Sequence, residues 1–112
     1  MKWDVTEKED HLLLAVEGRL DAVTAAEFNS AAARARETAP AVRLLVDLGG
    51  LEFISSAGLR GILSLAKNFQ QDSRPLAFCG LQPMVADVFK ISGLLTILKV
   101  FPDQAAALQG GW

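Results

Sequence analysis

The stretch from Leu44 to Lys67 constrains the fold most strongly, because its hydrophobic pattern changes from that of a strand to that of a helix across one short turn. It opens with a continuous apolar run, which is typical of a strand covered on both faces in a parallel sheet. We expect this central strand to span Val42–Asp47, and the pair Gly49–Gly50 to break it. A helix is predicted to begin at residues 55–58 and to run to about Gln70, because one helical face then carries Leu59, Ile62, Leu63 and Ala66.

Two serines, Ser55 and Ser56, stand where this helix is expected to begin. Serine is a favourable N-cap, because its hydroxyl accepts a hydrogen bond from a backbone N–H group that the helix leaves unpaired. Capping is therefore the simplest interpretation of both residues. The alternative is that one serine receives a phosphoryl group, which the positive end of the helix dipole tolerates and which adds about −1.5 to −2 charges. Such a modification would change the surface and leave the fold intact.

The rest of the chain alternates between strand and helix patterns. Trp3 and Val5 predict a short edge strand, which forms an opening hairpin with a strand at His11–Glu17. The further predictions are helices at Ala22–Thr38, Pro83–Ser92 and Pro102–Leu108, strands at Leu76–Cys79 and Thr96–Val100, and a loose tail at Gln109–Trp112. Asp21 is expected to cap the first of these helices and Pro40 to end it, while Met84, Val88, Phe89 and Ile91 give the second an apolar side.

Strands that alternate with helices indicate right-handed βαβ crossovers and an α/β fold. We therefore predict a single domain over residues 1–112, with a mostly parallel, mixed sheet of about five strands, an antiparallel edge hairpin and about four helices. Functional loops of such sheets gather beyond the carboxyl ends of the strands. Asp21 and Ser56 both follow a predicted strand, so we expect them at one end of the molecule.

Composition excludes several classes of protein. The 112 residues are 51% hydrophobic, which favours one packed domain over disorder. A net charge of −2 disfavours a nucleic-acid-binding protein, which usually carries a basic excess. No apolar run approaches the roughly 18 residues of a membrane span, and the N-terminus shows no signal-peptide pattern. A single cysteine fits a reducing compartment, so we expect a cytoplasmic protein.

Three segments resemble signatures of the anti-sigma factor antagonists, which are single-domain members of the STAS family. The central segment, Phe53–Leu59, resembles a signature that reads aromatic, apolar, Asp, Ser, Ser or Thr, Gly, Leu, Gly. Ser56 matches the serine that is phosphorylated in the family, whereas Ser55 stands where Asp is common and Arg60 where Gly is common. The other two matching segments are Gly18-Arg19-Leu20-Asp21 and Val88–Leu94, and the resemblance spans nearly the whole chain.

The resemblance implies a STAS fold and an interaction switch that regulates transcription. The unphosphorylated protein would bind an anti-sigma factor that is a serine kinase, and phosphorylation of Ser56, or of Ser55 as second choice, would release it. A serine phosphatase would reset the switch. ATP and Mg²⁺ would belong to the kinase, so no cofactor or metal is expected in this chain. The partner surface implied by the resemblance comprises Asp21, Ser55, Ser56, Ala57, Gly58, Leu59 and Arg60, although Asp21 is equally well interpreted as a cap.

The residues allow one alternative function and disfavour another. Small STAS domains also serve as subunits of lipid-transport ATPases or of larger signalling assemblies, where the same loop would dock without phosphorylation. An enzyme with a serine nucleophile is disfavoured, because a nucleophilic serine needs a base and an orienting group. The only histidine, His11, is interpreted as a solvated side chain on the hairpin, and Cys79 as a small buried residue. No Gly-x-Ser-x-Gly elbow or phosphate-binding loop is present, so we expect no catalysis.

Overall fold

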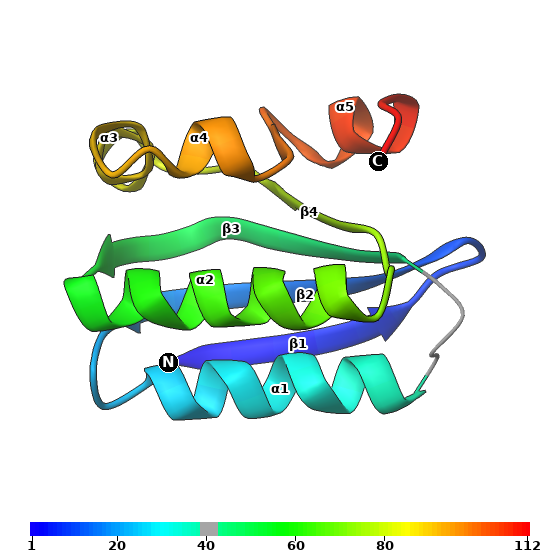
Figure 1. The fold of residues 1–112 in the computed structure, drawn as a ribbon, viewed down its shortest axis with the longest axis horizontal. Helices are drawn as coiled ribbons and strands as arrows, with labels where there is room; N and C mark the ends of the chain where they lie inside the picture. The colour runs from blue at the N-terminus through cyan, green and yellow to red at the C-terminus, as the bar shows by residue number, and fades with distance from the viewer. Residues whose placement is uncertain (39–42) are drawn as a thin grey trace.

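The computed structural model describes residues 1–38 and 43–112, which form one five-stranded sheet with helices packed on both of its faces (Figure 1). The strands, in their order across the sheet, are β1 (Lys2–Glu7), β2 (His11–Leu20), β3 (Arg43–Ile54), β4 (Leu76–Cys79) and β5 (Val100–Phe101). The helices are α1 (Ala25–Thr38), α2 (Ser56–Gln71), α3 (Pro83–Ile91), α4 (Leu94–Ile97) and α5 (Gln104–Gln109).

The topology confirms the predicted α/β class. β1 pairs antiparallel with β2, and the pairs β2–β3, β3–β4 and β4–β5 are parallel. The five strands and the antiparallel edge hairpin therefore match the prediction, and the short helix α4 is an addition to it. The positions predicted to end the first helix and to start the central strand, Pro40 and Val42, lie outside the described residues. No helix within the described ranges has the length and hydropathy needed to cross a membrane.

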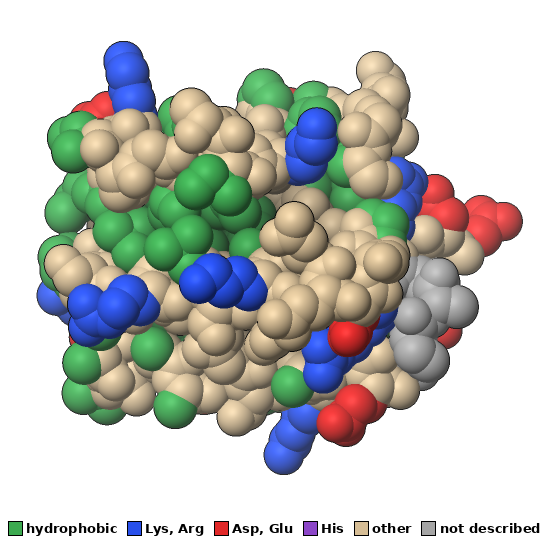
Figure 2. All heavy atoms as spheres, viewed as in Figure 1, with side chains coloured by type: hydrophobic (Ala, Val, Ile, Leu, Met, Phe, Trp, Pro, Cys, Tyr) green, Lys and Arg blue, Asp and Glu red, His purple; other side chains and the backbone are tan. Residues whose placement is uncertain are grey.

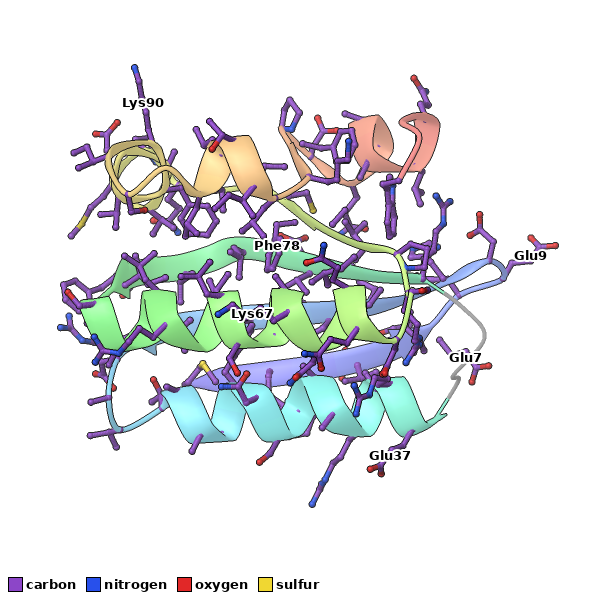
Figure 3. The ribbon with its side chains drawn as sticks, viewed as in Figure 1. Glu7, Glu9, Glu37, Lys67, Phe78 and Lys90 are labelled. Carbon is purple, nitrogen blue, oxygen red and sulfur yellow. The ribbon has the colours of Figure 1, made fainter. Side chains whose placement is uncertain are left out.

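Alternation of side chains along the strands builds a core on each face of the sheet. Leu12, Leu14, Leu44 and Val46 point toward the larger core, which α1, α2 and α3 cover with Phe28, Ile62, Phe69, Val85 and Phe89. Phe78 of β4 (Figure 3) belongs to the same core, and its ring meets Phe89 edge-on at 6.4 Å between centroids. Leu13, Leu45, Ala77 and Cys79 point the other way, toward Ala107 of α5.

β3 is longer than predicted, because Gly49–Gly50 lies inside the strand and does not break it. Its pairing with β2 shifts register twice between Ala15 and Arg19, which identifies β-bulges. A Cβ atom at position 50 would lie 2.6 Å from Cγ of Glu17, so only glycine permits this approach of the two strands. The expectation that the glycines end the strand was therefore wrong. Gly50 lets β3 pass β2 at the bulges, and the strand continues to Ile54, which precedes the N-cap of α2.

The bounds of the predicted strand at Thr96–Val100 are also wrong, because the observed strand β5 is Val100–Phe101. Gly93 adopts a left-handed φ of 80°, as a glycine that ends α3 should, and the chain then forms the single turn α4. The Thr96 hydroxyl donates to the Gly93 carbonyl oxygen at 2.7 Å, and Leu98 N–H donates to the Leu94 carbonyl at 2.9 Å. These local bonds favour a helical turn over an extended strand, and only Val100–Phe101 pairs with β4.

The apolar side predicted for α3 is only partly buried. Val85 and Phe89 are fully buried, and Val88 packs against the edge of the core. Met84 and Ile91 are 52% and 87% exposed, because they lie on the side of the helix that faces away from the core. The helix therefore leaves large hydrophobic side chains on the surface.

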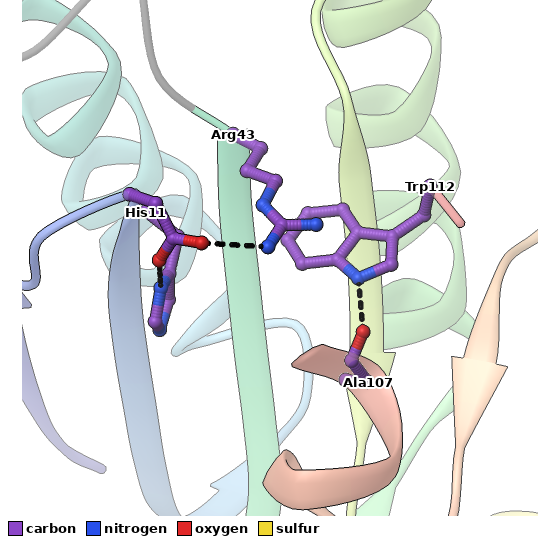
Figure 4. A network of polar contacts seen from close by, with 5 residues as sticks. His11, Arg43, Ala107 and Trp112 are labelled. Carbon is purple, nitrogen blue, oxygen red and sulfur yellow. Dashed lines mark hydrogen bonds and ion pairs between the residues drawn. The ribbon is translucent and has the colours of Figure 1, made fainter. Parts of the chain in front are cut away.

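The C-terminal tail is packed against the molecule, whereas a loose tail was predicted (Figure 4). The Nε1–H group of Trp112 donates to the carbonyl oxygen of Ala107 at 2.6 Å, and the Arg43 guanidinium lies 4.4 Å from the centre of its ring. Arg43 also donates to Asp10 at 3.0 Å, and Asp10 in turn accepts from Nδ1 of His11 at 2.7 Å. His11 is only 5% exposed, so its interpretation as a solvated side chain was wrong. The carboxylate of Asp10 satisfies the polar ring that the hairpin buries.

Candidate functional site

The carboxyl ends of β2 and β3 bring the two predicted loops together. The last residue pair of these parallel strands is Leu20 with Ile54, so Asp21 and Ser55 follow at the same edge of the sheet. The Ser55 N–H group donates to the carbonyl oxygen of Leu20 at 2.9 Å, which ties one loop to the other. The prediction that Asp21 and Ser56 lie at one end of the molecule is confirmed, and partner binding at these residues stays a prediction.

Asp21 organises the loop between β2 and α1. Its Oδ1 atom accepts from the N–H groups of Val23 at 3.0 Å and Thr24 at 3.1 Å, while its own N–H donates to the Thr24 hydroxyl at 2.9 Å. This turn occupies residues 22–24, so α1 begins at Ala25, three residues later than predicted. The bond from the Thr24 N–H group, followed by that from Val23, lowers the pKa of Asp21 below its ordinary value. Asp21 is therefore an ionised side chain that caps the turn before α1, at the rim of the site.

The structure assigns different positions to the two serines. Ser55 is the N-cap of α2, with an extended backbone, and its Oγ atom accepts from the N–H group of Gly58 at 3.1 Å. Ser56 is the first residue of the helix and is exposed. Its hydroxyl makes no hydrogen bond with any other described residue. Capping thus involves the hydroxyl of Ser55, and the hydroxyl of Ser56 is left to solvent.

Gly58 holds α2 against the end of β2. It is buried, and a Cβ atom at this position would lie 2.4 Å from the carbonyl oxygen of Leu20. Gly58 was predicted to be part of the partner surface, but it lies beneath that surface and supports the loop. Ala57 and Leu59 are half-buried on either side of it, and Arg60 is exposed. Within the described ranges, Arg60 has no ion-pair partner, and α2 has no acidic residue in its first turn.

A cation–π contact beside the serine loop was not predicted. The guanidinium of Arg19, near the end of β2, lies 4.1 Å from the centre of the Phe53 ring on β3. The two residues are paired across the parallel strands, which places the cation over the aromatic ring. The sequence does place Arg19 two residues before Asp21 and Phe53 three residues before Ser56. It does not show that the two residues pair, because their pairing follows a register shift between β2 and β3. Arg19 also contributes to the lowered pKa of Asp21.

Other reactive side chains lie elsewhere and are shielded. Cys79 is fully buried, and burial raises the pKa of its thiol to about 12, so it stays protonated. His11 lies at the start of β2, at the opposite end of that strand from Asp21. In the described parts of the chain, no group of three or more His, Cys, Asp or Glu side chains is placed to hold a metal ion. Among the described residues, the serine loop is therefore accompanied by neither the histidine nor the cysteine of the chain.

The fold and this loop define a small α/β domain with a solvent-facing serine at the start of a central helix. The model of the STAS domain family matches residues 2–107, and the chain belongs to this family. A curated relative, the proposed anti-sigma factor antagonist BtrV of Bordetella bronchiseptica, is 48% identical over 65 residues. That alignment covers 58% of this chain and 56% of BtrV, so the similarity spans little more than half of either protein.

Solved structures share the fold at low sequence identity. An anti-sigma factor antagonist from Mycobacterium paratuberculosis has a TM-score of 0.85 and 21% identity, with 96% of this chain and 91% of that chain covered. The phosphorylated form of the Bacillus cell fate determinant SpoIIAA has a TM-score of 0.70 and 16% identity, with 96% and 98% covered. At these identities the likeness establishes the STAS fold alone.

Proposed function

We propose that this chain is an anti-sigma factor antagonist whose binding is switched by phosphorylation of Ser56. When Ser56 is unmodified, the chain binds a serine kinase that acts as the anti-sigma factor, and this frees a sigma factor in the cytoplasm. The kinase brings ATP and Mg²⁺, phosphorylates Ser56 and is released, and a serine phosphatase restores the first state. The names of BtrV and of the Mycobacterium protein support the first part, and the phosphorylated SpoIIAA structure supports the second.

The observation that carries this proposal is the difference between the two serines. The Ser55 hydroxyl is engaged by Gly58, so its modification would remove the N-cap of α2. The Ser56 hydroxyl points to solvent from the first helical residue, so a phosphoryl group can be added there without breaking a hydrogen bond of the described structure. Ser56 therefore satisfies both requirements of a switch, access for a kinase and tolerance of the product.

The electrostatics of the loop also favour phosphate at Ser56. The N–H groups of the first helical residues precede the first intrahelical hydrogen bond, which Leu59 makes to Ser55. These groups and the helix dipole stabilise an anion at this position. Arg60 lies four residues after Ser56, on the same face of α2, where an anion followed by a cation is the favourable order. The local structure would thus accept about −1.5 to −2 charges that a bound partner would have to accommodate.

Like charges brought together at an interface cost several kcal/mol, and about 1.4 kcal/mol already weakens binding tenfold. The switch would therefore act through the partner and not through unfolding of this chain. Asp21 lies in the neighbouring loop, so its ionised carboxylate adds to the negative charge that the partner meets after modification. Arg19 and Arg60 are the nearby cations. Their positive charge exceeds the negative charge of Asp21 before modification, and the added phosphate makes the local net charge negative.

Intact mass spectrometry of the chain expressed in its native host tests the site of modification. The wild type and Ser55→Ala should each carry the mass of one phosphoryl group under some growth condition, and Ser56→Ala should never carry it. Full modification of Ser56→Ala would transfer the role to Ser55. A wild type that stays unmodified in every growth state would overturn the proposed switch and leave docking without phosphorylation, as in a transporter subunit.

Calorimetry with the kinase captured from the host tests the charge mechanism. Ser56→Asp should weaken binding by at least about tenfold, whereas the neutral control Ser56→Asn should bind within about threefold of the wild type. Equal affinity of the two variants would show that size, and not charge, controls release.

A further inference from the structure

A hydrophobic patch lies on the face of the molecule where α2 runs beside α3 and α4 (Figure 2). Leu59 and Leu63 of α2 and Val88 of α3 are only partly buried at the edge of the core, and Leu98 follows them just beyond α4. Ile97 at the end of α4 is 67% exposed. A contiguous exposed patch of large hydrophobic side chains on a small domain is typical of a binding surface.

The patch is hollowed by two depressions that follow one another along α2. The first, of about 270 Å³, lies on the helix and is lined by Arg60, Leu63, Ser64 and Lys67. The second, of about 290 Å³, lies between the C-terminal half of α2 and the segment that joins α4 to β5, where Ile97, Leu98 and Lys99 line it. Leu63 of the first depression and Ala66 of the second are three residues apart on α2, so the two depressions are neighbours on the helix surface; together they are called the α2–α4 groove.

The charges on the groove are opposite in sign to the charge of the chain. Four basic residues line the two depressions, and among the described residues no acidic side chain does: Arg60, Lys67, Arg74 and Lys99. The chain as a whole has 13 acidic and 11 basic residues. Arg60, Lys67 and Lys99 are exposed and make no ion pair within residues 1–38 and 43–112. Lys67 (Figure 3) stands on the outer side of α2, where a basic side chain borders the hydrophobic patch in Figure 2.

We propose that the α2–α4 groove binds an acidic amphipathic helix of a partner protein. The hydrophobic face of that helix would cover Leu63, Ile97 and Leu98, and acidic side chains on its flanks would pair with Lys67 and Lys99. An apolar groove with a cationic rim matches this ligand in both respects. The groove follows residues 60–70 of α2, which at 1.5 Å per residue gives about 15 Å, the length of about three helical turns. A strand is a poorer fit, because the neighbouring edge strand β5 has only two residues.

This site is distinct from the proposed switch. It shares Arg60 with the serine loop but extends along α2 away from Ser56, and its other side chains, such as Leu63, Lys67 and Lys99, take no part in the proposed phosphorylation. A helix bound here would remain in place when the serine loop releases its own contacts. The groove would thus provide a constitutive anchor beside a switched contact.

Titration of the ¹⁵N-labelled full chain with synthetic peptides tests the proposal. The probe is a helix-forming peptide of about four turns with leucine on one face and glutamate on both flanks. One control has the same composition in scrambled order, and the other has lysine in place of glutamate. The acidic amphipathic peptide alone should shift the amide signals of α2 and of residues 97–99, and the signals of the β1–β2 hairpin should stay in place.

Matched variants separate the groove from general effects of charge and hydrophobicity. Lys67→Glu combined with Lys99→Glu should weaken peptide binding about tenfold, because two favourable pairs become repulsive. Lys8→Glu, in the exposed hairpin turn, should leave binding unchanged. Ile97→Ser should also weaken binding severalfold, whereas Leu108→Ser, at an exposed position of α5, should not. Each of these side chains is exposed, so the variants should fold normally by circular dichroism.

Several results would overturn this assignment. The lysine peptide or the scrambled peptide could bind as well as the acidic one, or the acidic peptide could cause no signal changes even at millimolar concentration. The groove signals could also move when the concentration of the chain alone is raised, which would identify a second copy as the occupant. Stronger shifts of the same signals with anionic phospholipid vesicles would identify a membrane surface instead. The titration uses the unmodified chain without a kinase, so none of these outcomes bears on the switch at Ser56.

Discussion

Replacing Gly58 by alanine should destabilise the fold by up to about 2 kcal/mol, even though alanine is the better helix former. The added Cβ would lie 2.4 Å from the carbonyl oxygen of Leu20 and 3.0 Å from Cγ1 of Ile54. The Leu20 oxygen belongs to the backbone of β2 and already accepts from Ser55, so it has little room to move. Overpacking of this kind costs about 1–3 kcal/mol, and the gain in helix propensity offsets about 1 kcal/mol of that cost.

Gly61 offers a matched control in the same helix. The nearest atom to a Cβ at position 61 is Nδ2 of Asn29 at 3.3 Å, the end of a side chain that donates to the Ala25 carbonyl oxygen and needs to shift by only a few tenths of an ångström. Gly61→Ala should therefore be neutral or stabilise the fold by up to about 1 kcal/mol. Urea unfolding followed by circular dichroism measures both variants, provided that the slope with denaturant is unchanged. If Gly58→Ala matched the stability of Gly61→Ala, the argument that a backbone contact fixes α2 to β2 would be refuted.

Three further predictions concern single side chains of the described structure. Ser55→Ala should lower the stability of the fold by about 1 kcal/mol through loss of the N-cap, whereas Ser56→Ala should change it by less than about 0.5 kcal/mol in the same urea assay. The pKa of Asp21 is lowered from 3.8 in the folded state, so its contribution to stability should be present above pH 4 and lost as the pH falls through the folded pKa. The free energy of unfolding of Asp21→Asn should therefore fall less steeply between pH 5 and pH 2 than that of the wild type. Parallel curves of unfolding free energy against pH for the two proteins would contradict the assignment. Cys79 should resist a thiol reagent at neutral pH until urea unfolds the chain, because burial raises its pKa to about 12, and rapid labelling of the folded protein would contradict this.

The elements that the sequence predicts well are those whose signals are local. The capping serine, the apolar spacing of α2 and the alternation of strands with helices all lie within short windows, and the structure confirms the strand–loop–helix unit that carries the candidate site. The meeting of Asp21 with the serine loop was also predictable, because parallel strands end at the same edge of a sheet. These inferences needed only the order of the elements along the chain and the spacing of hydrophobic residues within each element.

Three of the errors have in common a contact between distant parts of the chain. The pair Gly49–Gly50 was predicted to end a strand, but Gly50 lets β3 pass the backbone of β2 at a bulge. His11 is polar and adjacent to acids, yet Asp10 and Arg43 allow it to be buried. Trp112 contacts the same Arg43 across the sheet. No local pattern reports such partners, because each depends on the register of strands that are far apart in sequence.

The choice between Ser55 and Ser56 combines both kinds of information. Their side chains are identical, so composition and spacing leave two candidates, and only the backbone distinguishes the capping residue from the first helical residue. The position of Ser55 is one where the resemblance leads us to expect Asp, whose charge would itself stabilise the helix N-terminus. With a neutral cap and no acid in the first turn, α2 begins without an anion and with Arg60 close behind. Phosphate at Ser56 would supply that missing charge, so modification should strengthen the start of the helix while it weakens a partner's hold on the surface.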